Sequence, residues 1–420
     1  MLIGSNRQND GPAIRVGVIG AGFVARGLLH RLVRRPGIAP PLVANRTVPH
    51  ALRVFAEAGV AEAELVISND PSVLSEAMQE GRPAVTSSAA ILRDVHGIDV
   101  VVEATGAMEV GTRAILDALR SGRHVVSMNA EVDALLGHYL DAVAQQSGAT
   151  YSIGDGDQPG VLLRMIDEAR DLGLEPTVAL NCKRNLNVHQ SPDDSRPYAE
   201  RDGTSVHMTT AFGDGTKMHI ENVVTANLSG LTPAPLGTPG VRTELATVAD
   251  DVRAEGIPPS SVHFALGGDF GGGVLVLASS PDPDFDAPYL RYGKLGDGPW
   301  YPLFRPYHLI HMELPWTIEQ LAAGGPALGN RTSKPVASCV ALAKRDLHAG
   351  EVLDGIGSGG CYGVAASIGE AKALLPIGLS QHAQMRRAVR QDQPITLDDV
   401  DLDEDAFLVG LHREATAAVS

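Results

Sequence analysis

Three polar residues in one short segment could carry out acid–base chemistry on a small substrate. Lys183, Arg184 and Asn185 follow an apolar, strand-like run. A like charge beside a lysine lowers its pKa, so Arg184 would help Lys183 to exchange a proton near neutral pH. We therefore predict Lys183 as the proton donor, Arg184 as a second catalytic group and Asn185 as a substrate ligand. The alternative interpretation is a pair of exposed basic residues at the end of a strand.

Two further clusters could assist this lysine. Asp155 and Asp157 lie in the segment SIGDGDQPG, where they could orient the lysine, bind substrate hydroxyls or hold a divalent cation. For Asp157, a helix N-cap before a proline-containing first turn is an equal alternative. Arg305, Tyr307 and His308 could anchor an anionic group or move a proton. We predict Asp157 and His308 as catalytic residues, and Asp155, Arg305 and Tyr307 as substrate ligands.

Three charged or titratable residues are expected to have no part in this chemistry. Residues 207–227 resemble two strands joined at Asp214-Gly215, a strong hairpin signal. Alternation along the second strand would bring Lys217, His219 and Glu221 onto one solvated or dimer-forming face. The motifs GxSxG and HExxH are absent from the sequence, so hydrolase and zinc-protease functions have no support.

A glycine turn near the N-terminus predicts a second binding site, which would hold a ligand beside these side chains. Residues 14–27 read IRVGVIGAGFVARG, a buried strand that breaks into a GxGxxA pattern. Gly20 permits the tight turn, Gly22 lets the backbone approach a pyrophosphate, and Ala25 lets the next helix pack on the strand. The helix N-terminus then favours the negative charge. Strand, turn and helix in this order predict a dinucleotide site that includes Phe23 and Val24.

The end of the second strand indicates which nicotinamide cofactor is preferred. NAD-selective folds carry an acidic residue at this point, which binds the ribose 2′-hydroxyl. Here the strand ends in Asn45-Arg46-Thr47, without a carboxylate. The Arg46 guanidinium suits a 2′-phosphate, and Asn45 and Thr47 can donate to the same oxygens. We expect NADP(H) to be favoured over NAD(H), with a solvated Arg46 as the alternative.

Two later strands end in polar residues that would flank the nicotinamide or its ribose. One strand leads into Ala104, Thr105 and Gly106, and the next into Asn129 and Glu131. Ligands of open α/β sheets bind at the carboxyl ends of the strands, so all five are predicted cofactor-binding residues.

The order of elements predicts an α/β protein in three parts. We expect an N-terminal Rossmann domain with a doubly wound parallel sheet (residues 1–153), because strand-like and helix-like segments alternate there. A central α+β catalytic or oligomerisation domain (154–332) would follow, and within it residues 281–301 are expected to form a loop. A small β-rich domain (333–420) would close the chain.

Composition narrows the class of protein. The chain has 420 residues and a formal charge of −16, which argues against nucleic-acid binding. Its three cysteines are widely spaced, as in reduced cytosolic proteins. The first twelve residues contain no apolar core of signal-peptide length, and no apolar window is long enough for a membrane span. We expect a cytoplasmic homo-oligomer that binds a small molecule and neither nucleic acid nor a membrane.

Several motifs resemble known families. Residues 333–420 resemble the SAF domain, through Ala343–Asp346, Ala349–Glu351, Leu375–Gly378 and Pro394–Asp398. The segments VVVEATG and HVVSMNAEVDALLG are similar to homoserine dehydrogenase, but Asn129 is not followed by that family's lysine, which argues against homoserine as the substrate. That family also has a lysine in the region of Lys183, so the resemblance supports the predicted proton donor.

A SAF-bearing branch of the same superfamily is a closer resemblance. It contains reductoisomerases for 1-deoxy-D-xylulose 5-phosphate and oxidoisomerases for sugar acids. The similarity extends over most of the chain, through residues 128–131, 151–159, 182–187, 192–194, 212–217, 227–231, 305–309 and 313–315.

Three functions remain after these observations. The first is an NADPH-dependent oxidoreductase acting on a small polyhydroxylated carbonyl compound, such as a sugar, sugar phosphate, sugar acid or cyclitol. The second is a reductoisomerase or oxidoisomerase, which would need a divalent metal or a second acid–base pair, with Asp155, Asp157 and Glu131 as candidates. The third is a sensor or scaffold that binds NADP(H) without turnover.

Overall fold

The computed structural model describes residues 12–419, and its internal contacts divide the chain into two units. Among the described residues, the first unit comprises 12–129, Tyr139–Asp157 and Leu309–Leu328, and the second Ala130–His138, Gln158–His308 and 329–419. Most of the N-terminal stretch considered for a signal peptide lies outside the described residues. Within residues 12–419, every helix is too short or too polar to cross a bilayer. The three-part division expected from the sequence stays a prediction.

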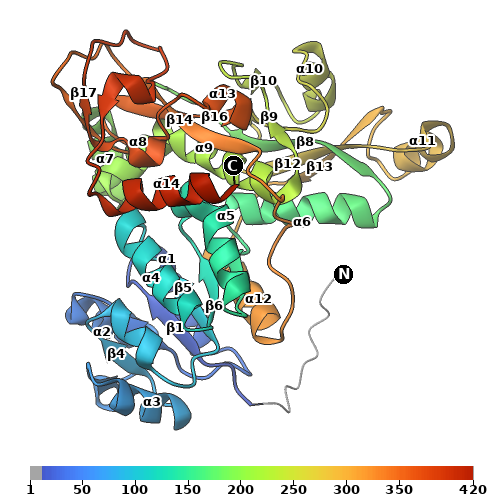
Figure 1. Ribbon diagram of the computed structural model, residues 1–420. Helices are drawn as coiled ribbons and strands as arrows, with labels where there is room; N and C mark the ends of the chain where they lie inside the picture. The colour runs from blue at the N-terminus through green and yellow to red at the C-terminus, as the bar shows by residue number, and fades with distance from the viewer. Residues whose placement is uncertain (1–11, 420) are drawn as a thin grey trace. The chain divides into compact units, whose positions relative to one another are not determined.

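A seven-stranded parallel sheet forms the centre of the first unit (Figure 1). Its strands are β1 (Val16–Ile19), β2 (Leu42–Ala44), β3 (Val66–Ile67), β4 (Ala84–Thr86), β5 (Val100–Glu103), β6 (His124–Ser127) and β7 (Tyr151–Ile153). They lie in the order β3-β4-β2-β1-β5-β6-β7, and every adjacent pair is parallel. Short runs rich in β-branched residues, largely buried except in the edge strand β3, account for this arrangement. The predicted Rossmann-type sheet is confirmed.

Helices alternate with these strands. They are α1 (Phe23–Leu32), α2 (Val48–Glu57), α3 (Pro71–Gln79), α4 (Met108–Arg120) and α5 (Ala130–Gln146), with short 3-10 turns at Glu62–Glu64 and Ala89–Asp94. The start of α3 shows how the sequence sets a boundary: Asp70 accepts from the backbone N–H of Ser72, and Pro71 occupies the first helical position.

A helix from much later in the chain completes the core of the first unit. Helix α12 (Ile310–Ala322) contributes Leu314, Ile318 and Leu321, all fully buried, to the cluster that contains Val16 and Leu28. Its Glu319 also forms an ion pair with Arg35.

The second unit has a mixed six-stranded sheet. Its strands are β8 (Glu175–Lys183), β9 (Thr232–Pro233), β10 (Val241–Arg242), β11 (Ser261–Leu266), β12 (Val274–Ser279) and β13 (Trp300–Arg305). The order is β10-β11-β8-β12-β13, with β9 paired to β11, and β12 is antiparallel to both of its neighbours. The helices are α6 (Gln158–Asp171), α7 (Pro192–Asp202), α8 (Val206–Gly213), α9 (Thr216–Ser229), α10 (Val248–Ala254) and α11 (Pro283–Tyr292).

The last ninety residues are rich in short strands, which confirms a small β-rich C-terminal region. The elements are β14 (Ala337–Ala343), β15 (Val352–Asp354), β16 (Cys361–Ser367), α13 (Ile368–Ala371), β17 (Gln381–Met385), β18 (Val400–Asp401) and α14 (Phe407–Val419), with 3-10 turns at Ile377–Leu379 and Leu397–Asp399. Strands β14 and β16 pair with each other, and β15, β17 and β18 form a second sheet.

The expected hairpin at residues 207–227 is wrong. The segment forms helices α8 and α9, and the Asp214-Gly215 pair begins the second helix. Gly215 has φ +86°, and the Asp214 carboxylate accepts from the backbone N–H of Thr216. A left-handed glycine after a short acceptor side chain suits a helix start as well as a hairpin. Helix α9 is buried from Thr216 to Leu228, so the sequence has no amphipathic period to reveal it.

The tract at residues 281–301, expected to be a loop, also contains a helix. Asp282 caps α11 by accepting from the backbone N–H of Phe285, and Pro283 takes the first helical position.

Candidate functional site

The glycine turn of the first unit has the shape that a dinucleotide pyrophosphate needs. Gly20 has φ +107°, and a Cβ there would lie 2.7 Å from the Ala104 carbonyl oxygen. Gly22 precedes α1, and a Cβ there would meet none of the described atoms within 4 Å. Backbone N–H groups at the start of α1 have no partner inside the helix and can therefore bind an anion. The turn fits the predicted cofactor.

Seven other predicted cofactor-binding residues follow the carboxyl ends of strands β2, β5 and β6, at one edge of this sheet. The last residues of β2 and β5 are register partners of Ile19, and Ser127 of β6 is the partner of Glu103. The residues that follow these strands therefore emerge side by side. They include Asn45, Arg46, Thr47, Ala104, Thr105, Gly106 and Asn129.

Exposure differs among these residues in a way that bears on cofactor choice. Arg46 and Thr47 are exposed, and the Asn45 amide donates to the Thr47 carbonyl at 2.7 Å. Thr105 is held inward, because its backbone N–H and its hydroxyl both donate to the buried Glu103 carboxylate. Phe23 is exposed at the start of α1.

In the second unit, Lys183 is the last residue of β8 and is partly buried. Its Nζ donates to the Phe212 carbonyl at 2.8 Å and lies 5.0 Å from the centre of the Phe212 ring. Burial lowers the pKa of Lys183, and the charge of Lys217 acts in the same direction, while the Glu221 and Asp214 carboxylates raise it. Arg184, whose guanidinium we expected to lower this pKa, is exposed, and so is Asn185.

Helix α9 supplies charges that sequence reasoning dismissed. Lys217 and Glu221 are buried rather than solvated. The Lys217 ammonium lies 2.9 Å from the Glu131 carboxylate, and the amide of Asn181, in β8, donates to Glu221 at 3.0 Å. The i, i+4 spacing of Lys217 and Glu221 fits one face of a helix, although the alternation of residues 217, 219 and 221 also fits a strand. Glu131, predicted to bind the cofactor, belongs to the second unit and has its carboxylate on Lys217.

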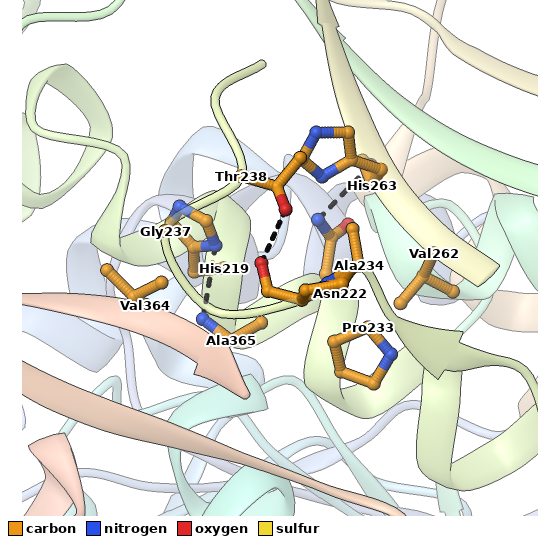
Figure 2. Close-up of a pocket in the computed structure, with 11 residues that line it drawn as sticks. His219, Asn222, Pro233, Ala234, Gly237, Thr238, Val262, His263, Val364 and Ala365 are labelled. Atoms are coloured by element: carbon orange, nitrogen blue, oxygen red, sulfur yellow. Dashed lines mark hydrogen bonds between the residues drawn. The ribbon is translucent and has the colours of Figure 1, made fainter. Parts of the chain in front are cut away.

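His219 is the third residue of that dismissed face, and it too is buried. Its Nδ1 accepts from the backbone N–H of Ala365, and it lines a small recess with Asn222 and His263 (Figure 2). Burial lowers the pKa of His219 to about 3, helped by the charges of His263 and Lys183. His219 is therefore neutral at physiological pH and cannot act as a cation there.

The remaining predicted residues lie in two places. Asp155, in the first unit, is buried: its backbone N–H donates to the Thr317 hydroxyl, and that hydroxyl donates to the Asp155 carboxylate, both at 2.8 Å. Asp157 is partly buried, directly before α6. In the second unit the Arg305 guanidinium stacks 4.8 Å from the centre of the exposed Tyr307 ring, and His308 follows in the chain.

A metal site has no preformed ligand set in the described part of the chain. Among residues 12–419, no three histidine, cysteine, aspartate or glutamate side chains gather as metal ligands would. The metal requirement stays an open prediction.

Two family models match the chain in succession. The NAD-binding domain of homoserine dehydrogenase matches residues 20–153, and the catalytic domain of oxidoreductase DRL matches residues 156–314. A search of curated proteins finds no significant match.

Solved structures with a similar course of the chain include three dehydrogenases or reductoisomerases. A probable dehydrogenase from Thermotoga maritima is 9% identical (TM-score 0.43) and covers 76% of this chain and 91% of its own. A myo-inositol dehydrogenase from Corynebacterium glutamicum is 10% identical (0.43; 76% and 90%). The 1-deoxy-D-xylulose 5-phosphate reductoisomerase from Zymomonas mobilis, in complex with NADPH, is 15% identical (0.38; 74% and 80%).

The two family matches cover the glycine turn and the surroundings of Lys183, respectively. The first begins at Gly20, in the glycine turn, and the second contains Lys183 with its Phe212, Lys217 and Glu221 neighbours. With an NAD-binding domain of the homoserine dehydrogenase type followed by a catalytic domain of the DRL type, the chain is an NAD(P)-dependent oxidoreductase.

Proposed function

We propose that this oxidoreductase transfers a hydride between NADP(H) and the carbonyl carbon of a small polyhydroxylated compound, with Lys183 as the acid–base group. The state of the Lys183 amine carries the proposal. The amine is fixed on the Phe212 carbonyl at 2.8 Å, in a partly buried position that lowers its pKa. An amine becomes a more effective acid–base group as its pKa falls toward the pH at which the enzyme works.

The nicotinamide, when bound, supplies the hydride in reduction and accepts it in oxidation. In reduction, the Lys183 ammonium donates a proton to the oxygen that becomes the hydroxyl of the product. In oxidation, the neutral Lys183 amine takes that hydroxyl proton. The Phe212 carbonyl accepts from the ammonium and so keeps it in one position.

The substrate class rests on the polar groups of the second unit. The Arg305 guanidinium stacks on the exposed Tyr307 ring, which gives this cationic group a defined orientation. A guanidinium of this kind binds carboxylate or phosphate oxygens through paired hydrogen bonds. Sugar phosphates, sugar acids, sugars and cyclitols are the compounds that such donors suit.

The preference for NADP(H) rests on Arg46. Its exposed guanidinium follows β2, where a carboxylate would select NAD(H), and the neighbouring Thr47 hydroxyl is exposed too. A ribose 2′-phosphate at this point would gain charge-assisted hydrogen bonds.

The test is Lys183→Met. We expect kcat for carbonyl reduction to fall at least about 100-fold, the usual contribution of a general acid, with NADPH affinity unchanged. Lys372→Met removes an exposed lysine and serves as the matched control. The substrates to screen with NADPH are aldoses, ketoses, their phosphates, aldonic and uronic acids, and oxidised cyclitols. Full turnover by Lys183→Met would show that another group moves the proton.

A further inference from the structure

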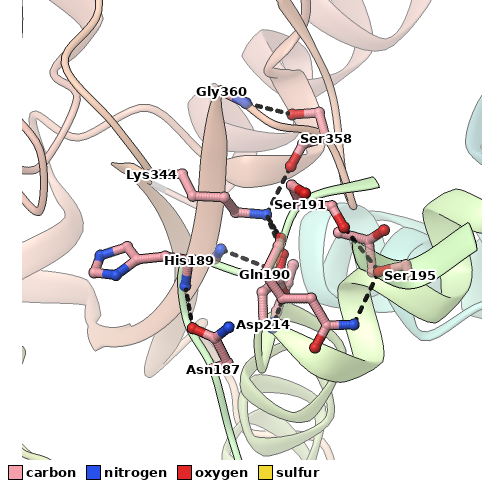
Figure 3. A network of polar contacts seen from close by, with 12 residues as sticks. Asn187, His189, Gln190, Ser191, Ser195, Asp214, Lys344, Ser358 and Gly360 are labelled. Carbon is pink, nitrogen blue, oxygen red and sulfur yellow. Dashed lines mark hydrogen bonds and ion pairs between the residues drawn. The ribbon is translucent and has the colours of Figure 1, made fainter. Parts of the chain in front are cut away.

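The C-terminal β-rich region contributes one fully buried lysine to the surroundings of Lys183. Lys344 directly follows β14 and is 3% exposed. Its Nζ donates to the Asp214 carboxylate at 2.7 Å, the Gln190 carbonyl at 2.9 Å and the Ser358 carbonyl at 2.6 Å (Figure 3). An ammonium has three protons, so each of them has an acceptor. This lysine is therefore held in a single position.

Asp214 links Lys344 to the ends of two helices. One carboxylate oxygen accepts from Lys344, and the other accepts from the backbone N–H of Thr216 at the start of α9. The backbone N–H of Asp214 donates to the Thr210 carbonyl at the end of α8. The peptide segment between these helices is thereby fixed at one point by Lys344.

That short segment is the one that holds Lys183. Phe212, whose carbonyl accepts from Lys183, stands two residues before Asp214. Gly213, between them, packs so closely on the Gln190 side chain that a Cβ there would overlap it. The backbone carbonyl of Gln190 also accepts a hydrogen bond from Lys344. Lys344 thus fixes the Phe212–Asp214 segment both through Asp214 and through Gln190.

We infer that Lys344 is a positioning residue for Lys183: the C-terminal region completes the acid–base site by holding the carbonyl on which the catalytic amine rests. The inference deepens the proposed function and rests on it for the word catalytic. The hydrogen bonds that connect Lys344 with Lys183 through Asp214, Gln190 and the Phe212 carbonyl do not depend on that function. A shift of about 1 Å in a reacting group can cost on the order of 100-fold in rate, so such a support has catalytic weight.

The test follows the chemical reactivity of Lys183 in the full-length protein. Reductive methylation with formaldehyde and cyanoborohydride modifies only the neutral amine, and mass spectrometry gives the rate at Lys183 as a function of pH. The midpoint of this curve reports the charges that face the amine, which come from Glu221, Asp214 and Lys217. The plateau at high pH reports how well the Phe212 carbonyl protects it.

Lys344→Met is the first variant. We expect a plateau several-fold higher than in the unmodified sequence and a kcat at least about tenfold lower, with Lys372→Met unchanged in both. Because this variant leaves the buried Asp214 carboxylate unpaired, it is made alongside Asp214→Asn/Lys344→Met, which removes both charges and keeps an oxygen for Thr216. Because the double variant leaves neither charge buried without its partner, it decides the matter if Lys344→Met alone does not fold.

A purely structural role would lower the melting temperature and leave the plateau and kcat unchanged below it. A folded variant whose methylation plateau equals that of the original sequence, and whose kcat is within twofold of the original kcat, overturns the inference. A shift of the midpoint without a change in the plateau overturns it as well. The plateau is measured without substrate. An active Lys183→Met protein would therefore refute the proposed function while the positioning contact is judged separately.

Discussion

Gly20 and Gly22 differ in what a side chain would meet. At Gly20 the positive φ and the nearby Ala104 carbonyl both exclude a Cβ. At Gly22 the described protein leaves the space open, so the fold itself does not exclude a side chain there, and we propose that a bound pyrophosphate would.

Gly22→Ala should therefore separate binding from stability. We expect an unchanged melting temperature and an NADPH affinity reduced at least about tenfold, because the added methyl group would occupy the pyrophosphate position. Isothermal titration and thermal unfolding measure the two quantities, and Gly20→Ala is the contrasting variant that should lose stability. Normal NADPH affinity in Gly22→Ala would contradict the location of the pyrophosphate.

Arg46 is tested by comparing two cofactors. Arg46→Ala should weaken NADPH binding about tenfold or more and leave NADH binding within about twofold, because only NADPH carries the 2′-phosphate. Fluorescence titration of both cofactors gives the ratio. Equal affinity of the unmodified protein for NADPH and NADH would remove the basis of the NADP(H) preference.

At the scale of elements, α9 is a buried helix that carries its own charges. It has Lys217 opposite Glu131 and Glu221 bonded to Asn181, both inside the second unit. Burying an ion pair is costly, and it persists only where the geometry compensates both charges.

Removing one partner of this pair should destabilise the protein strongly. We expect Glu131→Gln to lower the free energy of unfolding by about 3 kcal/mol, because it leaves the Lys217 ammonium buried without its carboxylate. The double variant Glu131→Gln/Lys217→Met should recover part of that loss. Urea unfolding followed by circular dichroism measures both, and a Glu131→Gln protein as stable as the unmodified one would show that the pair is solvated.

The same helix marks the limit of prediction from sequence. The parallel sheet could be predicted because its strands are short β-branched runs between amphipathic helices and its first turn has a specific glycine spacing. Helix α9 could not, because it is buried on all sides and begins with an Asp-Gly pair that also favours a hairpin. Lys183 could be proposed from its polar neighbours in the sequence, whereas Phe212 contacts it through a backbone carbonyl, which no residue type reveals. Lys344 lies 161 positions from Lys183, and only tertiary structure connects them.

At the scale of the whole molecule, buried histidines make stability depend on pH. The pKa of His219 falls to about 3 and that of His138 to about 4, in each case chiefly through burial. Burial also lowers the pKa values of His263 and His412. An unfolded histidine has a pKa of about 6.5, so the unfolded chain binds more protons below that pH. The stabilisation is complete above about pH 6.5 and is lost as the pH falls.

For His219 alone, the loss between pH 7 and pH 5 should amount to about 2 kcal/mol. His219→Asn keeps an acceptor for the Ala365 N–H and cannot become charged, so its stability should depend less steeply on pH. Urea unfolding at pH 5, 6 and 7 compares the two proteins. Parallel pH dependence would show that His219 does not contribute.

The late position of helix α12 in the chain has a consequence during synthesis on the ribosome. The core of the first unit begins with strand β1 at Val16, yet it needs Leu314, Ile318 and Leu321 to close. At about 5–20 residues per second, translation from residue 157 to residue 310 takes roughly 8–30 s. Throughout that interval the nascent first unit presents an uncovered apolar surface. Chaperones that recognise such surfaces therefore have time to engage this chain before its own helix arrives.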